Sequence, residues 1–111
     1  MGLYESNHLR LQRLAGNLAR LNGTLVSHVA DDCQLTLAVV ERAPYTSQLQ
    51  MTYLLPERVP DLRLRVYHDA GLVEALGPGG VPERELGQRW LQNMMLNKWL
   101  EYCAERGHRF R

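Results

Sequence analysis

The residues best suited to acid–base chemistry are His68 and Asp69, which are adjacent in a chain of 111 residues. A histidine beside a carboxylate is the arrangement of a general base with the group that orients it. Neighbouring side chains on a strand point to opposite faces, however, so these two do not easily hydrogen-bond to each other. Asp69 can instead begin a turn while His68 packs at the rim of a sheet. A hydrolase-like site built from His68 with Asp69 or Glu41 is therefore one hypothesis, with no substrate class attached.

A second group of polar side chains is expected on one face of a sheet. Arginine with an aromatic ring is how proteins hold single-stranded RNA, since bases stack on the ring and cations hold the phosphates. With one aromatic residue on this face and a net charge near zero, a solvated sheet face is the simpler explanation of the same residues. The candidate ligand-binding residues are Arg63, Arg65, Tyr67, Gln50 and Tyr45, with Gln48 beside them. Tyr45 also belongs to a cluster with Glu41, Arg42 and Thr46 around a turn, where such groups can orient a small anion or cap a hairpin.

Sequence motifs for metal or cofactor chemistry are missing. His28, Cys33, His68, Glu41 and Asp69 do not show the spacing of a zinc or iron site, so we expect no metal. The glycine-rich run from Gly77 to Gly80 lacks both the GK[ST] and the GxGxxG pattern, and no GxSxG occurs. We expect no cofactor.

The elements that must position these residues are five strands between two helices. Alternating apolar and polar residues predict a three-stranded core over 34–66, as in Leu49 and Met51 alternating with Gln48 and Gln50. The predicted order is helix Leu3–Leu21, strands Thr24–Ala30, Gln34–Arg42, Tyr45–Leu54, Leu62–His68 and Leu72–Leu76, and helix Glu83–Arg106. This order predicts one α+β domain over 1–111, with both helices on one face of an antiparallel meander.

The last predicted helix carries more apolar residues than one face requires. At 100° per residue, its buried arc is expected to hold Leu91, Leu96, Met95, Trp99, Tyr102 and Cys103, opposite Asn93, Asn97, Glu101 and Glu105. Trp90 and Met94 then fall on the polar side. Either the first helix or the Gly-rich connector covers them, or they form an interface. Tryptophan and methionine are enriched at interface cores, and a symmetric homodimer is the simplest assembly.

The charge, the apolar runs and the cysteines of the sequence narrow the binding partners and the cellular compartment that we expect. The net charge is +1, so no overall field attracts nucleic acid or an anionic membrane. No apolar run is long enough to be a signal peptide or to span a membrane. Cys33 and Cys103 form no disulfide framework, and we expect both as reduced thiols in the cytoplasm.

Several stretches resemble the YqiB-like family of uncharacterised bacterial proteins. They are the start at 3–7, residues 35–37 and 45–46, the YHDA stretch at 67–70, and the helix stretch at 97–103. This resemblance implies a small cytoplasmic protein of unknown function and imports no reaction or cofactor. Family members carry a longer polar segment before the last helix, which is shortened here to 77–82, so a site in that segment would be lost.

The sequence thus leaves three functional hypotheses. The first is a non-enzymatic protein-interaction domain that forms a homodimer through Trp90 and Met94. The second is a small-molecule or RNA binder that uses the polar sheet face. The third is the hydrolase-like enzyme built on His68.

Overall fold

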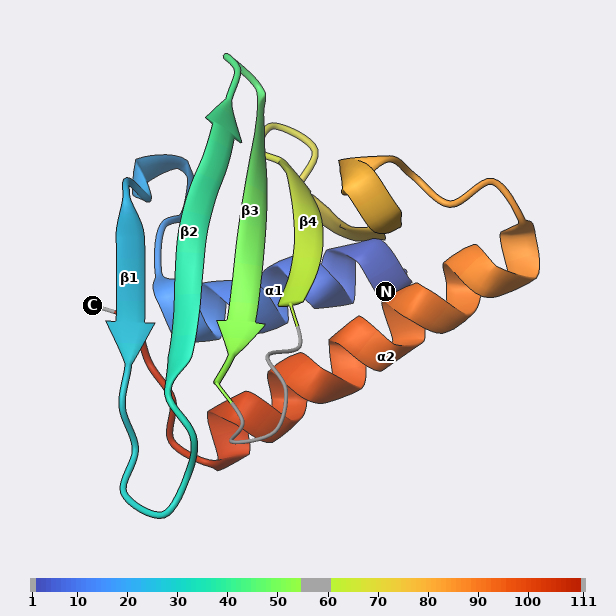
Figure 1. Ribbon diagram of the computed structural model, residues 1–111. Helices are drawn as coiled ribbons and strands as arrows, with labels where there is room; N and C mark the ends of the chain where they lie inside the picture. The colour runs from blue at the N-terminus through green and yellow to red at the C-terminus, as the bar shows by residue number, and fades with distance from the viewer. Residues whose placement is uncertain (1, 55–60, 111) are drawn as a thin grey trace.

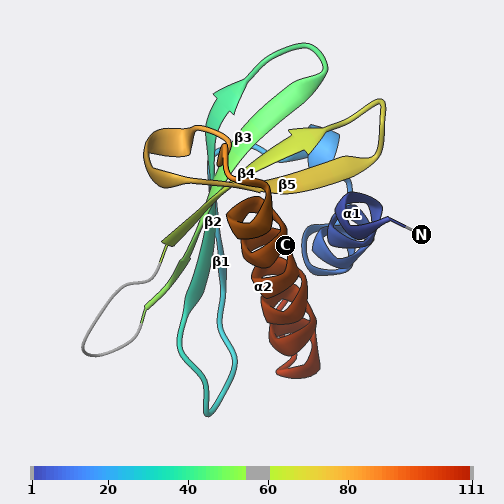
Figure 2. The same cartoon turned by 90° about the vertical axis from the view of Figure 1, so that its right-hand side faces the viewer.

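The computed structural model describes residues 2–54 and 61–110 and confirms the α+β fold. Five antiparallel strands form one sheet in the order β1-β2-β3-β4-β5. Both helices lie side by side on one face of this sheet, and the other face is largely open (Figures 1 and 2). The elements are α1 (Leu3–Ala15), the short 3₁₀ helix η1 (Leu18–Arg20), β1 (Thr24–Ser27), β2 (Leu35–Arg42), β3 (Thr46–Tyr53), β4 (Asp61–Tyr67), β5 (Leu72–Leu76), the 3₁₀ helix η2 (Pro78–Gly80) and α2 (Leu86–Glu105).

The core lies between the sheet and the two helices. β3 alternates strictly, and its four buried residues, Ser47, Leu49, Met51 and Tyr53, face the helices. Leu11 and Leu14 of α1 are buried against them. The alternation is therefore sufficient to predict which side chains of the strand point to the helices.

Several element boundaries differ from the sequence prediction; for example, β1 ends at Ser27 rather than Ala30, and α2 begins at Leu86 rather than Glu83. The first helix ends at Ala15 rather than Leu21, because Gly16 adopts φ +74° and its N–H closes the last turn on Gln12. The connector at 77–80 forms η2, which packs over the open sheet face. Gly80 there has φ +76° and lies directly against the amide of Gln48, where a Cβ would collide. This turn covers part of the face that was expected to be fully exposed.

The buried face of α2 also differs from the prediction. Asn93, expected in solvent, is fully buried, whereas Leu91, Met95 and Tyr102 are exposed. The reason is the outer edge of β5. The Ala75 N–H donates to Asn93 Oδ1 over 2.8 Å, and Asn7 Nδ2 donates to the Val73 carbonyl over 3.1 Å. These two backbone groups face away from β4 and need partners, because an unpaired buried peptide group is costly.

The two helices are joined to each other by the same asparagines. Asn7 Nδ2 lies 3.3 Å from Asn93 Oδ1, and Asn97 Nδ2 donates to Asn7 Oδ1 over 3.0 Å. Asn93 in turn donates to the Arg89 carbonyl over 2.9 Å. Asn7, Asn93 and Asn97, hereafter the asparagine cluster, therefore fix the rotation of α2 about its axis.

Replacing Asn93 with alanine should destabilise the fold by about 3 kcal/mol, since it leaves the Ala75 N–H and Asn7 without a partner and opens a cavity. Urea unfolding at one fixed protein concentration measures this change. Asn22→Ala, at an exposed asparagine, is the matched control and should change stability by less than about 0.5 kcal/mol. Equal stability of the two variants would mean that the asparagine cluster does not hold the fold.

Candidate functional site

The outer face of α2 carries five of the exposed large apolar side chains that the structure describes. We define it by its exposed residues Leu86, Trp90, Leu91, Met95 and Tyr102. Leu86 is 76%, Trp90 59% and Met95 63% exposed. Between Arg89 and Glu101 the sequence holds a single charged residue, Lys98. Surfaces of this kind, poor in charge and rich in aromatic and methionine side chains, are typical of interface cores.

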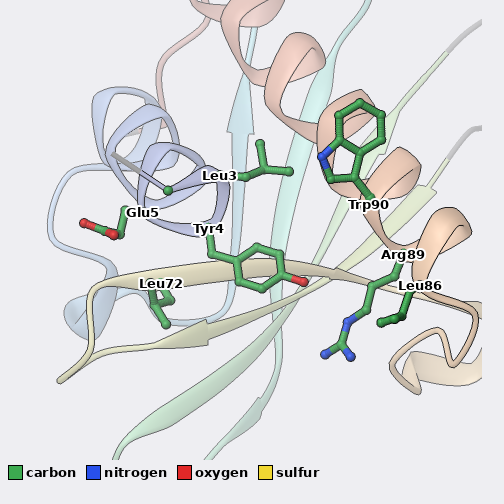
Figure 3. A pocket seen from close by; sticks show the side chains of 8 residues that line it. Leu3, Tyr4, Glu5, Leu72, Leu86, Arg89 and Trp90 are labelled. Carbon is green, nitrogen blue, oxygen red and sulfur yellow. The ribbon is translucent and has the colours of Figure 1, made fainter.

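An apolar cavity of about 390 Å³ adjoins this face at the start of α2. Its walls come from α1, β5 and α2, and include Leu3, Tyr4, Leu72, Leu86 and Trp90 (Figure 3). The Tyr4 ring extends across the cavity towards Arg89 (Figure 3). Trp90 is therefore both an exposed side chain and a cavity wall. The alternative that the chain itself covers Trp90 is wrong, whereas Met94 is partly buried.

A buried carboxylate anchors the polar edge of this cavity. Glu74 is 3% exposed and accepts from Arg89 Nη2 over 3.0 Å and from the Tyr67 hydroxyl over 2.5 Å. The hydrogen bond to Glu74 raises the pKa of Arg89. Burial and the hydrogen bond to Glu74 both raise the pKa of Tyr67. Arg89 and the Tyr67 hydroxyl are thus already paired within the chain and hold β5 to α2 and β4.

The open sheet face brings only some of the predicted ligand-binding residues together. Gln48 pairs with Arg65 across β3 and β4, and Gln50 pairs with Arg63. Arg65 and Tyr67 line a small polar hollow of about 180 Å³, together with Glu41, Thr46 and Gln48.

The remaining predicted residues lie elsewhere. Gln50 donates to Asp61 over 2.6 Å, and Arg63 lies next to Gly80 of η2. Tyr45 is 68% exposed at the β2–β3 turn and does not line the hollow.

The predicted catalytic residues are not brought together. His68 Nε2 lies 2.8 Å from Ser47 Oγ, which points to the helix-covered face. His8 of α1 is close by, and burial, followed by the charge of His68, lowers the pKa of His8. Glu41 lines the hollow on the opposite face of the sheet, and Asp69 is exposed. His68 therefore pairs with a serine rather than with either carboxylate.

A serine–histidine–aspartate set exists elsewhere, and the sequence prediction missed it. His108 Nδ1 lies 2.9 Å from Ser27 Oγ, and His108 Nε2 lies 2.9 Å from Asp32 Oδ2. Ser27 also accepts from the Arg109 N–H over 2.9 Å, which leaves its hydroxyl proton for His108. Residues 81 and 76 positions apart form these contacts, so no local spacing could reveal them.

This set does not form an accessible nucleophile. Ser27 is 2% and His108 1% exposed, so a substrate cannot reach the hydroxyl as it must in a catalytic triad. Phe110, two residues further on, is buried, and its N–H donates to the Leu14 carbonyl over 2.7 Å. The set instead fastens the segment after α2 to β1 and α1. We refer to Ser27, Asp32 and His108 as the tail clamp.

Among residues 2–54 and 61–110, no group of three histidine, cysteine or acidic side chains could hold a metal ion. No helix in these ranges is both long and apolar enough to cross a membrane. Cys33 and Cys103 are free thiols. Burial raises the pKa of Cys103 to about 12, with a further contribution from Asp32, so this thiol stays protonated.

The tail clamp should make the folding stability of the protein fall at low pH. Burial acts to raise the pKa of Asp32, but hydrogen bonds from Tyr53, the Cys33 N–H and His108 outweigh it and lower the pKa to about 2. A folded-state pKa below the unfolded value adds stability that is complete above about pH 4 and is lost as the pH falls towards 2. The contribution is about 2 kcal/mol.

Thermal unfolding of wild type, Asp32→Asn and the exposed control Asp69→Asn between pH 6 and pH 2.5 checks this. The difference between wild type and Asp32→Asn should shrink as the pH falls, while Asp69→Asn should follow wild type throughout. A constant difference across the range would show that the Asp32 carboxylate does not stabilise the fold by its charge.

The comparison with protein families gives one match. Residues 10–109 match the model of a family described as "Protein of unknown function (DUF1249)". No match was found among curated proteins or among solved structures. The matched range covers both the α2 outer face and the tail clamp, and the second half of α1 from Arg10 onwards. On this match, the chain belongs to the DUF1249 family of proteins of unknown function.

Proposed function

We propose that this protein is a non-enzymatic interaction domain that forms a homodimer through the outer face of α2. The observation that carries the proposal is the exposed Trp90 beside an apolar cavity whose wall it forms. Binding energy at interfaces is concentrated in a few aromatic anchors that enter pockets on the partner. Here the anchor and the pocket lie on one surface.

A second copy of the chain is the partner that this arrangement fits. In a two-fold dimer the same patch is used by both copies and must be complementary to itself. Leu86 and Trp90 project from the surface, while Leu3, Tyr4 and Leu72 line the adjoining cavity. A two-fold rotation can place the projecting side chains of each copy in the cavity of the other. Each copy then both fills its partner's cavity and has its own cavity filled.

The charges near this face are compatible with such a contact. Arg89 is already paired with Glu74, and Glu101 with Arg10 over 2.8 Å. Neither pair leaves an uncompensated charge to be buried, which would oppose association. Lys98 can keep its ammonium group in water while its aliphatic stem covers apolar surface.

The remaining assignments are part of the same proposal. The YHDA stretch at 67–70 supports membership of the YqiB-like proteins and hence a bacterial, cytoplasmic protein. The two free thiols are in keeping with a reducing compartment. One core that unites both helices and the sheet supports a single domain over 1–111.

Sedimentation velocity over a concentration series tests the dimer. Trp90→Ala should weaken self-association by about 30-fold or more, as expected for an interface anchor. Tyr45→Ala is the matched control, because Tyr45 is also an exposed aromatic residue but lies at the β2–β3 turn. A wild-type chain that stays monomeric at high micromolar concentration would refute the proposal, as would a dimer that tolerates Trp90→Ala.

A second candidate function is binding of a small polar molecule or RNA on the open sheet face. The observation that favours it is the hollow that joins Arg65 and Tyr67 to Glu41 and Gln48. Its volume of about 180 Å³ suits a group the size of a phosphate or a carboxylate rather than a whole nucleotide. The guanidinium of Arg65 and the side chain of Tyr67, which both line the hollow, would contact this group.

Titration with a nucleoside monophosphate and with a short single-stranded RNA at low salt tests this candidate. Arg65→Ala should weaken binding at least tenfold, and the affinity should fall as salt rises. Arg20→Ala, at an exposed arginine on η1, is the control for general charge and should have little effect. Absence of binding at low salt, or equal losses in both variants, would exclude the hollow as the site.

A further inference from the structure

The strand β1 forms the edge of the sheet opposite to β5. The Gly23 carbonyl, just before β1, accepts from the Val39 N–H of β2 over 2.9 Å. Every second residue of an antiparallel strand bonds to its neighbour, so the N–H and C=O groups of Thr24 and Val26 point away from β2. Among the residues that the structure describes, no backbone group bonds to them. Thr24 is exposed and Val26 is 46% exposed, so this row of donors and acceptors is open to solvent.

This edge lacks most of the features that keep edge strands from pairing with other chains. Charged side chains, prolines and bulges are the usual ones. The sequence from Leu21 to Ala30 contains no lysine, arginine, aspartate, glutamate or proline, and the pairing of β1 with β2 has no bulge. At β5, in contrast, Asn7 and Asn93 bond to the outward backbone groups. β1 is only 4 residues long, which suits one short added strand better than the pairing of whole sheets.

The surroundings of this edge are basic. The Arg42 guanidinium donates to the Ala19 carbonyl of η1, near the start of β1. At the end of β1, the Arg109 N–H donates to Ser27 Oγ over 2.9 Å, and Arg109 lines a hollow of about 260 Å³ that no acidic side chain lines. Asp31 is the exposed carboxylate nearest to β1 in the sequence. The exposed arginines near the two ends of β1 are Arg13, Arg20, Arg42 and Arg109.

We propose that the edge of β1 binds an extended acidic segment of a partner protein, which joins the sheet as a sixth strand. In this mode of recognition the main chain supplies the hydrogen bonds, here to Thr24 and Val26, and the side chains supply the specificity. Carboxylates of the segment face the arginines at the two ends of β1. Complementary charge of this kind selects the partner more than it adds affinity.

A second copy of the chain fits this edge less well. Two β1 strands that pair antiparallel are related by a two-fold axis normal to the sheet, so both helix layers lie on the same side. The segment after α2 lies on that side and beside β1 (Figure 1), where it bonds to Ser27 and to the Leu14 carbonyl of α1. The exposed Arg109 of each copy would then approach that of the other, and like charges oppose association. The β1 edge is therefore distinct from the α2 outer face proposed for the homodimer.

Two designed pentapeptides with blocked ends test the proposal. Both alternate a charged residue with valine; one carries glutamate and the other lysine. NMR titration at the Thr24 and Val26 amides should show the glutamate peptide binding about tenfold more tightly. The glutamate peptide methylated on its backbone nitrogens cannot donate to the edge and should not shift these amides. The proposal fails if the glutamate peptide leaves them unshifted at millimolar concentration, or if the methylated peptide binds equally well.

Two variants of one residue test the backbone contact. Val26→Pro removes an N–H that points away from β2, and proline is found in edge strands at such positions, so the peptide should bind at least tenfold more weakly. Val26→Thr keeps the N–H and the branched shape and should bind as wild type does. Equal binding by both variants would show that the peptide does not pair with the edge.

A third pair of variants tests the charges. Arg20→Gln combined with Arg109→Gln should remove the preference for the glutamate peptide, whereas Arg84→Gln, at an exposed arginine before α2, should keep it. Sedimentation velocity separates the edge from the homodimer. Self-association that is lost in Val26→Pro but kept in Trp90→Ala would mean that the edge binds a second copy, and would overturn the proposal.

Discussion

The capture of the outer edge of β5 by two buried asparagines is the interaction on which the arrangement of the helices depends. β5 pairs with β4 on one side only, so the Val73 carbonyl and the Ala75 N–H point away from the sheet. An edge strand left in this state would be open to pairing with other chains. Asn7 of α1 and Asn93 of α2 supply the missing partners, and they bring both helices to the same strand.

The rotation of α2 follows from this capture. With Asn93 directed at β5, the residues on the opposite side of the helix must face solvent, and those residues include Leu91 and Met95. Buried polar groups fix a unique arrangement only when each is satisfied, and the asparagine cluster meets this condition through its bonds to β5, to Ser6 and to the Arg89 carbonyl. The chain thereby exposes apolar surface that an ordinary amphipathic helix would bury. The closing of the sheet edge therefore accounts for the exposure of Leu91 and Met95 on the α2 outer face.

The strands and the first helix could be predicted from the sequence because their signals are local. Leu49 and Met51 alternate with glutamines, and Leu11 and Leu14 recur at helical spacing. Each pattern fits one type of secondary structure and one buried face. The predicted buried face of α2 was wrong, because the prediction placed asparagine side chains in water, whereas Asn93 hydrogen-bonds to the backbone of β5. Its partner, Ala75, lies 18 positions away in the sequence, so the sequence of the helix alone does not reveal the bond.

The candidate sites divide in the same way. An excess of apolar residues on one helix was visible in the sequence and identified Trp90, but the cavity beside it requires α1, β5 and α2 together. Arg65, Tyr67 and Glu41 were named separately, and the strand pairing brings them into one hollow. The tail clamp depends on contacts between distant segments, for which the sequence carries no pattern.

The most direct test of the account is an intermolecular NOE experiment on a mixture of isotope-labelled and unlabelled protein at a concentration that favours association. Only contacts between copies appear in the filtered spectrum. The account predicts contacts from the Trp90 ring and the Leu86 methyl groups of one copy to Leu3 and Leu72 of the other. A dimer whose intermolecular contacts lie on another surface, or a filtered spectrum without any such contact, would contradict the account.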